Sequence, residues 1–555
     1  MYRNLLGGLA PWVILSILVF SSCKKDIRVE EPPVVTGFWD VNGSSKIDFK
    51  KTYDIIVYGG TPAGIMSAVE AKRSGKSVLL VNHSEGALGG MLTNGLGNTD
   101  ILHQKILGGL SKEFFKRIKM FYGNEESWFI KNIPKYGVDG KFIDIMIRFE
   151  PRAAQSVFKD LIMTEGIAVM HNDRLKQKNG VGRKNGKIEW IDMESGKRLK
   201  GKVFIDASYE GDLMAFTGVE YFVGRESNSR YGERFNGIRP MSNSSRFQIP
   251  DGVKSDYFSR FINNGIGSTG MEDHRVQAYC YRMCLTDIEE NKVQIEKPID
   301  YKEELYEVLF SYLENYKGIP FFDLNLMPNR KTDSNNSGPV STDFVGENYK
   351  YPNGTYAERA EIRKKHRNYQ VGLLWTLQNH PKVPEYIRQN TSKWGLAKDE
   401  FTDNGHWPKQ LYIRESRRMI SDYVMTENNC NGNINVDYSV GLGDYPMDSH
   451  IVQRFVDKNG NIKNEGHAMV GVPRPYGIDY RSIVPKQVEC TNLIVPVCLS
   501  ASHIAYGSIR MEPVFMSLGQ AATCIAVLAI DQKKPVQSIN YTDLASLMAK
   551  REMAF

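Results

Sequence analysis

Two short apolar runs near the start of the chain enclose a glycine-rich turn and a stretch with helical spacing. The first run, Tyr53–Tyr58, consists almost entirely of β-formers, and the second covers Ser77–Val81. Between them, Ile65 and Val69 recur at helical spacing, and Gly75 stops the helix. Continuous apolar runs of this length are typical of buried parallel strands. The pattern therefore predicts a unit of strand, turn, helix and strand.

A further strand-like run, Asn492–Val497, stands near the C-terminus, far from this unit. A long mixed segment separates them, and no repeat of about 20 to 50 residues is visible, which excludes solenoids and propellers. We expect an α/β beginning, a mixed middle and an α/β end.

The turn after the first run carries the first candidate chemistry, and it covers Gly59–Gly64, "GGTPAG". Gly59 makes the tight bend, Gly60 lets the main chain approach a ligand, and Gly64 permits close packing of helix on strand, while the helix N-terminus attracts a pyrophosphate. A bare glycine-rich match is often a plain turn, but this one lies between a strand and a helix. Two positions depart from the usual pattern: Thr61 replaces a glycine, and Asn82 stands where an acidic ribose ligand is expected. We still predict a dinucleotide site, because an asparagine also bonds a ribose.

A second glycine doublet follows the second strand, in Leu88–Thr93, "LGGMLT". Together with "YGGTPAGI", it resembles the FAD-dependent oxidoreductases of the glutathione-reductase type. Val203–Asp212 is similar to the returning strand of that FAD domain. The run from Asn492 through "YGSIRMEP" to "LGQAA" is similar to its last strand and flavin-facing helix, although Leu499-Ser500 stands in place of the usual Gly-Asp.

Intermediate blocks extend the resemblance to a family of bacterial FAD-dependent oxidoreductases, many of them exported or lipidated. These blocks are "FEPRAA", "VGRES", "YRMCLT", "PNRKTDSNNSGPVSTDF" and "LYIRESRRM", and the likeness covers Tyr53 to Ile530. The resemblance implies an α/β fold: a Rossmann-like FAD-binding domain with a parallel sheet of the glutathione-reductase type, and an inserted mixed α+β substrate or cap domain. The FAD-binding domain then covers 48–213 and 485–555, and the cap covers 214–484.

The same resemblance implies FAD as the cofactor and marks the residues that hold it. The expected cofactor-binding residues are Gly59, Gly60, Thr61, Pro62, Ala63, Gly64, Asn82, Gly89, Gly90, Met91, Asp206, Ala207, Ser208, Ser500 and Gly519.

The cysteines indicate neither a cluster nor a metal site. Six remain beyond Cys23, and they lack the tight run that an iron-sulfur cluster needs. Cys280 and Cys284 are typical of two small side chains packed on a helix face. Paired histidines at helical spacing are also absent from the sequence, so we expect no metal.

The candidate catalytic groups lie near the C-terminus. A flavin that oxidises an alcohol needs a base for the hydroxyl proton and a cation for developing negative charge. His503 is the first candidate base, and Arg510 is the candidate cation for an oxygen of substrate or flavin. His450 is the alternative base, and a hydrogen-bonded turn histidine is the alternative role of His503.

Two blocks of the middle segment leave alternatives open. Pro328–Phe344 is dense in turn formers and predicts either a surface loop or a wall of the site. Arg414, Arg417 and Arg418 fall at helical spacing, so a solvated helix face is one reading and a functional group the other.

The first residues indicate an export signal. Arg3 is followed by the uncharged run 5–20 and then by Ser21-Ser22-Cys23, which resembles the lipobox of bacterial lipoproteins. We expect a signal peptide in 1–22, a lipidated Cys23 and a tether in 23–47, with a simple membrane anchor as the alternative. The chain would then be anchored by lipid to the bacterial envelope, on its periplasmic or surface side.

Composition and charge narrow the partners. The chain has 555 residues, 41% hydrophobic and 24% charged, with a net charge of +7. This excess is too weak for phosphate-backbone binding, so we expect no nucleic acid. The expected function is hydride transfer between flavin and a small polar substrate, with a carbohydrate-derived one as first choice because an exported enzyme meets glycans. The electron acceptor stays open. The alternative is a nutrient- or glycan-binding lipoprotein without redox activity.

Overall fold

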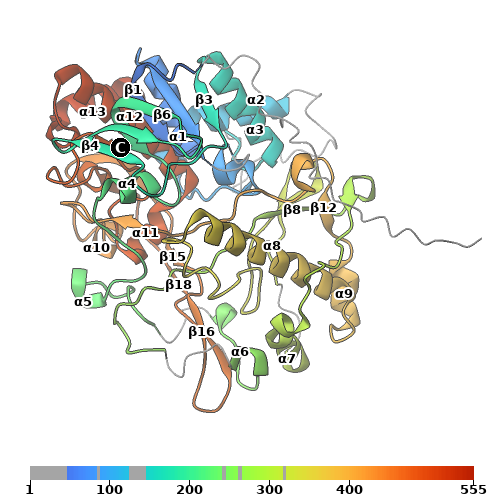
Figure 1. Ribbon diagram of the computed structural model, residues 1–555. Helices are drawn as coiled ribbons and strands as arrows, with labels where there is room; N and C mark the ends of the chain where they lie inside the picture. The colour runs from blue at the N-terminus through green and yellow to red at the C-terminus, as the bar shows by residue number, and fades with distance from the viewer. Residues whose placement is uncertain (1–46, 84–87, 124–144, 240–244, 260–265, 317–320) are drawn as a thin grey trace, which may run out of the picture.

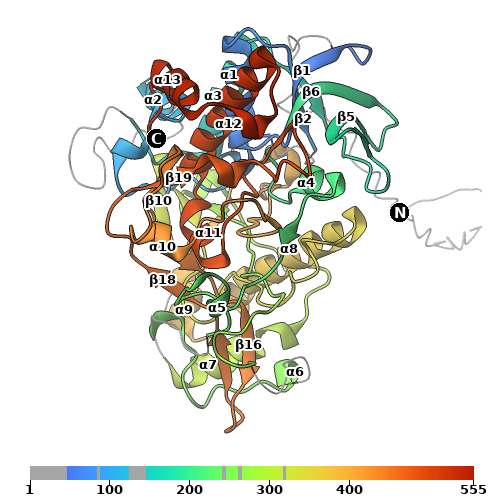
Figure 2. The ribbon, with the colours of Figure 1, turned by 90° about the vertical axis from the view of Figure 1, so that its left-hand side faces the viewer.

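The computed structural model describes residues 47–83, 88–123, 145–239, 245–259, 266–316 and 321–555. The expected signal peptide, Cys23 and nearly all of the tether lie outside the described residues. Elements from the two ends of the chain form one part of the molecule, and the middle of the chain forms the other (Figures 1 and 2).

A seven-stranded mixed sheet organises the first part. Its strand order is β3-β2-β1-β6-β5-β4, and β20 pairs with β6. β1, β2, β3, β6 and β20 run parallel, whereas β4 and β5 form an antiparallel extension of β6. The strands are β1 (Thr52–Tyr58), β2 (Val78–Asn82), β3 (Ala168–His171), β4 (Val181–Lys184), β5 (Lys187–Asp192), β6 (Arg198–Asp206) and β20 (Leu493–Ile494). The α/β fold and the predicted strands near Tyr53–Tyr58 and Ser77–Val81 are thus confirmed. The returning strand expected in Val203–Asp212 is β6, which begins earlier and ends at Asp206, and the expected last strand shortens to two residues.

The apolar run of β1 exists because both faces of this strand are covered. Ile55 and Val57 belong to one hydrophobic cluster, and Ile56 and Tyr58 belong to another. Side chains alternate across a strand, so a strand buried on both faces must be apolar at every position.

Helices from both ends of the chain pack together on this sheet. They are α1 (Pro62–Arg73), α2 (Gly109–Gly123), α3 (Pro151–Thr164), α12 (Glu512–Gln532) and α13 (Tyr541–Lys550). α1 and α12 approach closely, since the Ser67 hydroxyl donates to the Gly519 carbonyl at 2.8 Å. α12 is long and apolar enough to cross a membrane, but 89% of its apolar window is buried inside the molecule, as in a core helix.

The middle of the chain builds a five-stranded antiparallel sheet with order β10-β11-β8-β12-β9, beside the long helix α8 (Figure 1). Its elements are β8 (Met283–Thr286), β9 (Lys292–Val293), β10 (Asn325–Met327), β11 (Lys331–Ser334), β12 (Gly395–Ala397) and α8 (Tyr356–Asn379). The other helices of the middle and of its junctions are α4 (Asp212–Thr217), α5 (Asn228–Tyr231), α6 (Asp256–Ser259), α7 (Glu307–Asn315), α9 (Glu385–Thr391), α10 (Glu427–Cys430) and α11 (His503–Ile509). The remaining strands form two-stranded ladders: β7 (Tyr221–Phe222), β13 (Arg418–Met419), β14 (Ser439–Gly443), β15 (Met447–Ser449), β16 (Gln453–Val456), β17 (Ile462–Glu465), β18 (Ala468–Val470) and β19 (Tyr476–Asp479).

The structure corrects the readings of the polar blocks in the middle segment. Within Pro328–Phe344, Lys331–Ser334 forms β11 and is fully buried, so the surface-loop reading is wrong there, while the reading as a wall of the site stays a prediction. The arginine group is neither helical nor solvated. Its segment contains no helix and ends in the short strand β13. All three side chains are buried and paired with carboxylates: Arg414 with Asp343, Arg417 with Asp212 and Arg418 with Glu226. Burial of a guanidinium is tolerated because each one meets a carboxylate.

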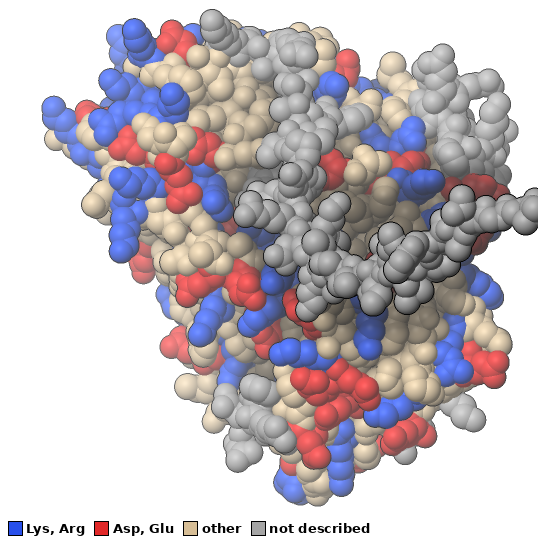
Figure 3. All heavy atoms as spheres, turned by 45° about the vertical axis from the view of Figure 1, so that its right-hand side comes forward, with Lys and Arg blue, Asp and Glu red and all other residues tan. Residues whose placement is uncertain are grey.

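The helix expected for the cysteine pair is also absent. Cys284 lies in β8, and the backbone of Cys280 forms an isolated antiparallel β-bridge with Tyr412. The six cysteines of the described part are free and buried. On the surface, acidic and basic side chains are interspersed over the face that Figure 3 draws.

Candidate functional site

The first glycine turn closes tightly against the end of β6. Gly59 has φ +118°, and a Cβ there would lie 2.5 Å from the Ala207 carbonyl carbon. A Cβ at Gly64 would lie 1.9 Å from the Gly59 oxygen. Both contacts are with backbone, which has no room to move, so the turn requires glycine at both positions.

Thr61 explains how the turn works without its usual glycine. Its hydroxyl donates to the Ala207 carbonyl at 2.7 Å and accepts from the Gly64 amide at 3.3 Å, which makes Thr61 the N-cap of α1. Pro62 and Ala63 then begin the helix. The free amides of a first helical turn attract anions, so this end of α1 is suited to a pyrophosphate.

The second glycine doublet lies directly on the first turn. The Gly89 amide donates to the Gly60 carbonyl at 2.7 Å. Gly90 faces Tyr209, since a Cβ on Gly90 would lie 2.3 Å from the tyrosine hydroxyl oxygen. The predicted turns, which are about 30 residues apart in the sequence, therefore form one surface at the carboxyl ends of parallel strands, where α/β folds bind ligands.

Asn82 and Asp206 end the two strands that flank β1. Asn82 is buried at the end of β2, and a Cβ on Gly60 would lie 2.3 Å from its Oδ1. The Asp206 carboxylate accepts from the Ser208 amide and hydroxyl and from the Met214 amide, and burial raises the pKa of Asp206 to about 6. Asp206 and Ser208 thus shape the chain behind Gly59.

Two expected cofactor residues make contacts of another kind. Gly519 lies within α12, where a Cβ would meet the Ala63 oxygen at 2.3 Å, so glycine here permits helix packing. The Ser500 hydroxyl accepts from the Ser421 amide at 3.1 Å, and the Ser500 amide donates to the Ser482 carbonyl. A role of Gly519 or Ser500 in binding FAD stays a prediction.

His503 is held from both sides of its ring. Nδ1 lies 2.8 Å from Glu415 Oε2, and Nε2 lies 2.9 Å from the Ser449 hydroxyl. Its backbone amide donates to Glu226 at 3.0 Å, and the residue is 1% exposed. These contacts fasten α11 to its neighbours, and the catalytic role expected for His503 stays a prediction.

His450 lies between two carboxylates. Its Nδ1 is 3.1 Å from Asp343 and its Nε2 is 3.2 Å from Asp448. Burial would raise the pKa of Asp343, but Arg414 and His450 lower it to about 2. Burial likewise opposes ionisation of Asp448, whose pKa is held well below its usual range by His450 and Arg510. Unlike His503, the His450 side chain keeps 11% of its surface exposed.

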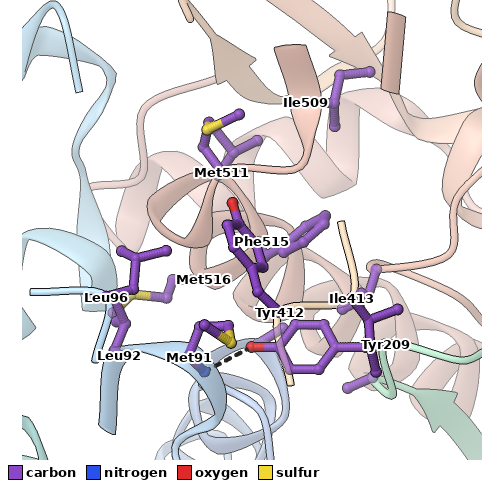
Figure 4. Packing of buried hydrophobic residues seen from close by; sticks show 14 of the residues in the cluster. Met91, Leu92, Leu96, Tyr209, Tyr412, Ile413, Ile509, Met511, Phe515 and Met516 are labelled. Atoms are coloured by element: carbon purple, nitrogen blue, oxygen red, sulfur yellow. Dashed lines mark hydrogen bonds between the residues drawn. The ribbon is translucent and has the colours of Figure 1, made fainter. Parts of the chain in front are cut away.

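Arg510 connects this group to Tyr412. Nη1 donates to the Tyr412 hydroxyl at 2.8 Å, and Nη2 donates to Asp448 at 3.0 Å. The guanidinium of Arg414 lies 4.8 Å from the centre of the Tyr412 ring, and that of Arg282 lies 5.7 Å from it. In Figure 4, Tyr412 is drawn with Met91 and Tyr209 from the turns after β2 and β6.

Sequence reasoning missed several members of this site. Burial raises the pKa of Asp100 to about 6, and Asp100 and burial together raise the pKa of Tyr445 well above its usual value. Both side chains are partly exposed within a buried region. We call the following residues the polar cluster: Asp100, Tyr412, Tyr445, Asp448, His450 and Arg510. Asp448 lies two residues before His450 in the sequence, and this proximity is the signal that marks it, whereas nothing local marks Asp100.

One group of carboxylates elsewhere has metal-like spacing. Glu150, Asp399 and Glu400 offer oxygens within 4.8 Å of one another. The ammonium of Lys331 lies among them, at 2.6, 2.7 and 2.8 Å respectively. The cation at this place is therefore the lysine, and the group ties β11 to α3.

The residues at the two turns fit FAD. The N-terminus of α1 and two flat glycine turns meet at the carboxyl ends of the parallel strands. In the polar cluster, Arg510 Nε is buried and has no hydrogen-bond partner in the described part of the chain. A dinucleotide with a polar ring system matches both features. This combination of fold and site defines a dinucleotide-binding flavoprotein.

Comparison with known families agrees. The family model described as FAD dependent oxidoreductase matches residues 54–548. The match covers most of the chain, so the protein belongs to this family: it is an FAD-dependent oxidoreductase, as the sequence resemblance predicts, and its cofactor is FAD. No curated protein matches the sequence.

Several solved structures match part of the chain. L-proline dehydrogenase from P. horikoshii has 14% identity and a TM-score of 0.23, with 32% of this chain and 59% of that chain covered. OxyS anhydrotetracycline hydroxylase from Streptomyces rimosus has 11% identity and a TM-score of 0.22, covering 32% and 36%. AlpK has 10% identity and a TM-score of 0.27, covering 56% and 49%. This chain therefore spans less than two thirds of each of these proteins.

Proposed function

We propose that the chain transfers a hydride between its flavin and a small polar substrate derived from carbohydrate. In this proposal, 48–213 and 485–555 form an FAD-binding domain of the glutathione-reductase type, and 214–484 form an inserted substrate or cap domain. The order of the parallel strands supports this division, because β20 from the C-terminal segment joins a sheet that the N-terminal segment builds.

The polar cluster is the observation that carries the proposal. It joins a residue of the N-terminal segment, Asp100, to residues of the middle and of the turn between α11 and α12. Asp448 and His450 keep 14% and 11% of their side-chain surface exposed, and Asp100 and Tyr445 are also partly exposed. Partly exposed polar groups within a buried region are typical of a ligand site.

FAD, when bound, supplies a hydride acceptor and donor at its isoalloxazine ring. The residues of the chain bind the substrate hydroxyl and hold its proton. We assign the substrate hydroxyl proton to the pair of His450 and Asp448, whose Nε2 and carboxylate oxygen lie 3.2 Å apart. We assign to Arg510 the stabilisation of the negative charge that develops on the substrate oxygen. Asp343 fixes the orientation of His450 from the opposite side of its ring.

The pairing of charges favours a neutral polyhydroxyl substrate. Each arginine around Tyr412 meets its own carboxylate: Arg282 with Asp333, Arg414 with Asp343 and Arg510 with Asp448. Paired ions give the site little net charge with which to attract a strongly ionic substrate. Their remaining oxygens and N–H groups still accept and donate hydrogen bonds, which neighbouring hydroxyl groups of a sugar can satisfy.

An anaerobic flavin-bleaching screen tests this proposal. Purified holoprotein is mixed with panels of sugars, sugar acids and amines, and the visible flavin absorbance is followed. We expect a neutral sugar to bleach the flavin. Bleaching by amines alone would contradict the substrate class, and a chain that purifies with FAD but is bleached by no panel, while dithionite still reduces it, would contradict the proposed hydride transfer from these substrates.

We further propose that the enzyme is exported and lipidated on Cys23, with 1–22 removed and 23–47 as a tether to the envelope. Support comes from the lipobox-like residues Ser21-Ser22-Cys23 after an apolar run. The natural electron acceptor would then be a component of the envelope or of its surroundings.

A further inference from the structure

The carboxyl group of Glu512 lies where α12 meets the second glycine turn. Glu512 is the first residue of α12, and its Oε1 accepts a hydrogen bond from the Tyr209 hydroxyl. The same hydroxyl accepts from the Met91 amide at 3.0 Å, a bond drawn in Figure 4. Tyr209 thus connects Glu512 to the turn of Gly90, which belongs to the proposed FAD site.

The second oxygen of this carboxyl group has no partner. Glu512 is 4% exposed, and its Oε2 is buried without a hydrogen bond among the described residues. A buried polar atom without a partner is rare in proteins, because it loses its bonds to water without replacing them. A bound group that supplies the missing bond removes this cost.

The surroundings of Glu512 favour its neutral form. Burial raises the pKa of Glu512 to about 8, and the hydrogen bond from Tyr209 is the opposing influence. Tyr209 comes from the turn after β6, and Tyr412, from the middle segment, faces Tyr209 in turn. Arg510, two residues before Glu512, is engaged with Tyr412 and Asp448. Within the described ranges, Glu512 forms no ion pair. At neutral pH the side chain is therefore mainly a carboxylic acid with one hydrogen to donate.

We propose that Glu512 contacts FAD and binds it as a neutral carboxylic acid, which donates the hydrogen on Oε2 to the cofactor. The inference rests on the proposed FAD site and adds a residue that the glycine motifs do not mark. An ionised Glu512 has no hydrogen to give and would place a buried negative charge beside a cofactor that already carries a pyrophosphate. FAD affinity should therefore fall as Glu512 ionises.

The pH dependence of FAD binding tests this without any substrate. The dissociation constant of FAD is measured across the range around pH 8, for the wild type, Glu512→Gln and Glu70→Gln. Glutamine keeps the size of the side chain and a hydrogen-bond donor but does not titrate. Glu70 is the matched control: it is a buried carboxylate of α1 that bonds Arg551 at 2.7 Å and Gln520 at 2.9 Å.

We expect the affinity of the wild type and of Glu70→Gln to fall by up to about tenfold per pH unit above the Glu512 pKa. Glu512→Gln should bind FAD with little dependence on pH. If Glu512→Gln kept the wild-type dependence, or if the wild type showed none, the inference would be wrong.

Tyr209→Phe provides the second variant should Glu512→Gln fail to fold. Loss of the tyrosine hydroxyl removes the influence that lowers the Glu512 pKa, so the midpoint of the pH dependence should move upward. An unchanged midpoint would overturn the inference. Failure of the proposed FAD site has a different signature, since Gly64→Val would then keep its FAD.

Discussion

Arg510 joins the polar cluster to the turn before α12. Its guanidinium is buried and bonded to Tyr412 and Asp448, so truncation removes a fixed positive charge from the proposed site. We expect Arg510→Ala to slow flavin reduction by substrate about a hundredfold, or roughly 3 kcal/mol, a usual loss for one preorganised electrostatic contact. It should also lower the reduction potential of the flavin.

Stopped-flow absorbance under anaerobic conditions measures this effect, with FAD content and melting temperature as controls. Reduction at the wild-type rate would remove Arg510 from the mechanism.

The variant His503→Ala distinguishes a catalytic role of this histidine from a structural one. The ring bonds Glu415 and Ser449, so His503→Ala removes one partner from a buried carboxylate and one from a buried hydroxyl. Burial opposes ionisation of Glu415, and the lowering of its pKa depends on His503 and Arg418. We expect His503→Ala to lower the free energy of unfolding by about 2 to 4 kcal/mol. Thermal unfolding measures it, and an unchanged melting temperature with slow flavin reduction would instead support the base role.

At this scale, sequence could predict residues whose role depends on their immediate neighbours. Gly59, Gly64 and the doublet at Gly89 are predictable because turn geometry is local. Glu512 and Asp100 are not, since their environment is created by chain segments hundreds of residues away, such as the turn of Tyr209.

At the scale of elements, a buried ion group docks α8 onto α4. Asp212 begins α4, Arg359 of α8 bonds it at 2.7 and 2.9 Å, and Arg417 bonds it at 2.7 Å. Burial opposes the charge on Asp212, but the two arginines hold its pKa well below the usual range. The stabilisation by this ion group is therefore fully present above the pKa of Asp212 in the unfolded chain, about 4. It is lost as pH falls from that value toward the lower pKa of Asp212 in the folded protein.

We expect Asp212→Asn to cost about 3 to 5 kcal/mol of unfolding free energy at neutral pH, because it leaves two buried guanidinium groups without their carboxylate. Below about pH 4 the difference from wild type should shrink. Urea unfolding of the wild type and the variant, at neutral pH and below about pH 4, measures this difference in unfolding free energy. Asp300→Asn is the control: Asp300 is 60% exposed and 3.9 Å from Lys364, so its loss should change stability by less than about 1 kcal/mol. An equal effect of the two variants would contradict the docking role.

Elements with apolar periodicity were predictable, and polar buried elements were not. β1 follows from its apolar run, whereas β11 contains Lys331 and Asp333, which look like a loop in sequence. Lys331 is buried because three carboxylates surround it, and all three, Glu150, Asp399 and Glu400, lie far from it along the chain. Sequence spacing alone does not reveal such pairing.

At the scale of the whole molecule, the two ends of the chain complete one part built on the seven-stranded sheet, as β20 and α12 join β6 and α1. The domain boundaries stay a prediction. The proposed lipid anchor at Cys23 would attach this assembly to the envelope, because two acyl chains anchor stably where one is marginal. We expect Cys23→Ala to abolish incorporation of labelled fatty acid and membrane association. Labelling of that variant would rule out the lipobox.

The most direct measurement is the amount of FAD bound per chain by Gly64→Val, in protein expressed without residues 1–22. A side chain at Gly64 would strike the Gly59 oxygen and force the turn apart. Gly471→Ala is the control, because its Cβ would meet nothing within 4 Å. The account predicts about one FAD per chain for wild type and Gly471→Ala, and colourless protein for Gly64→Val. Full FAD occupancy in folded Gly64→Val would contradict it.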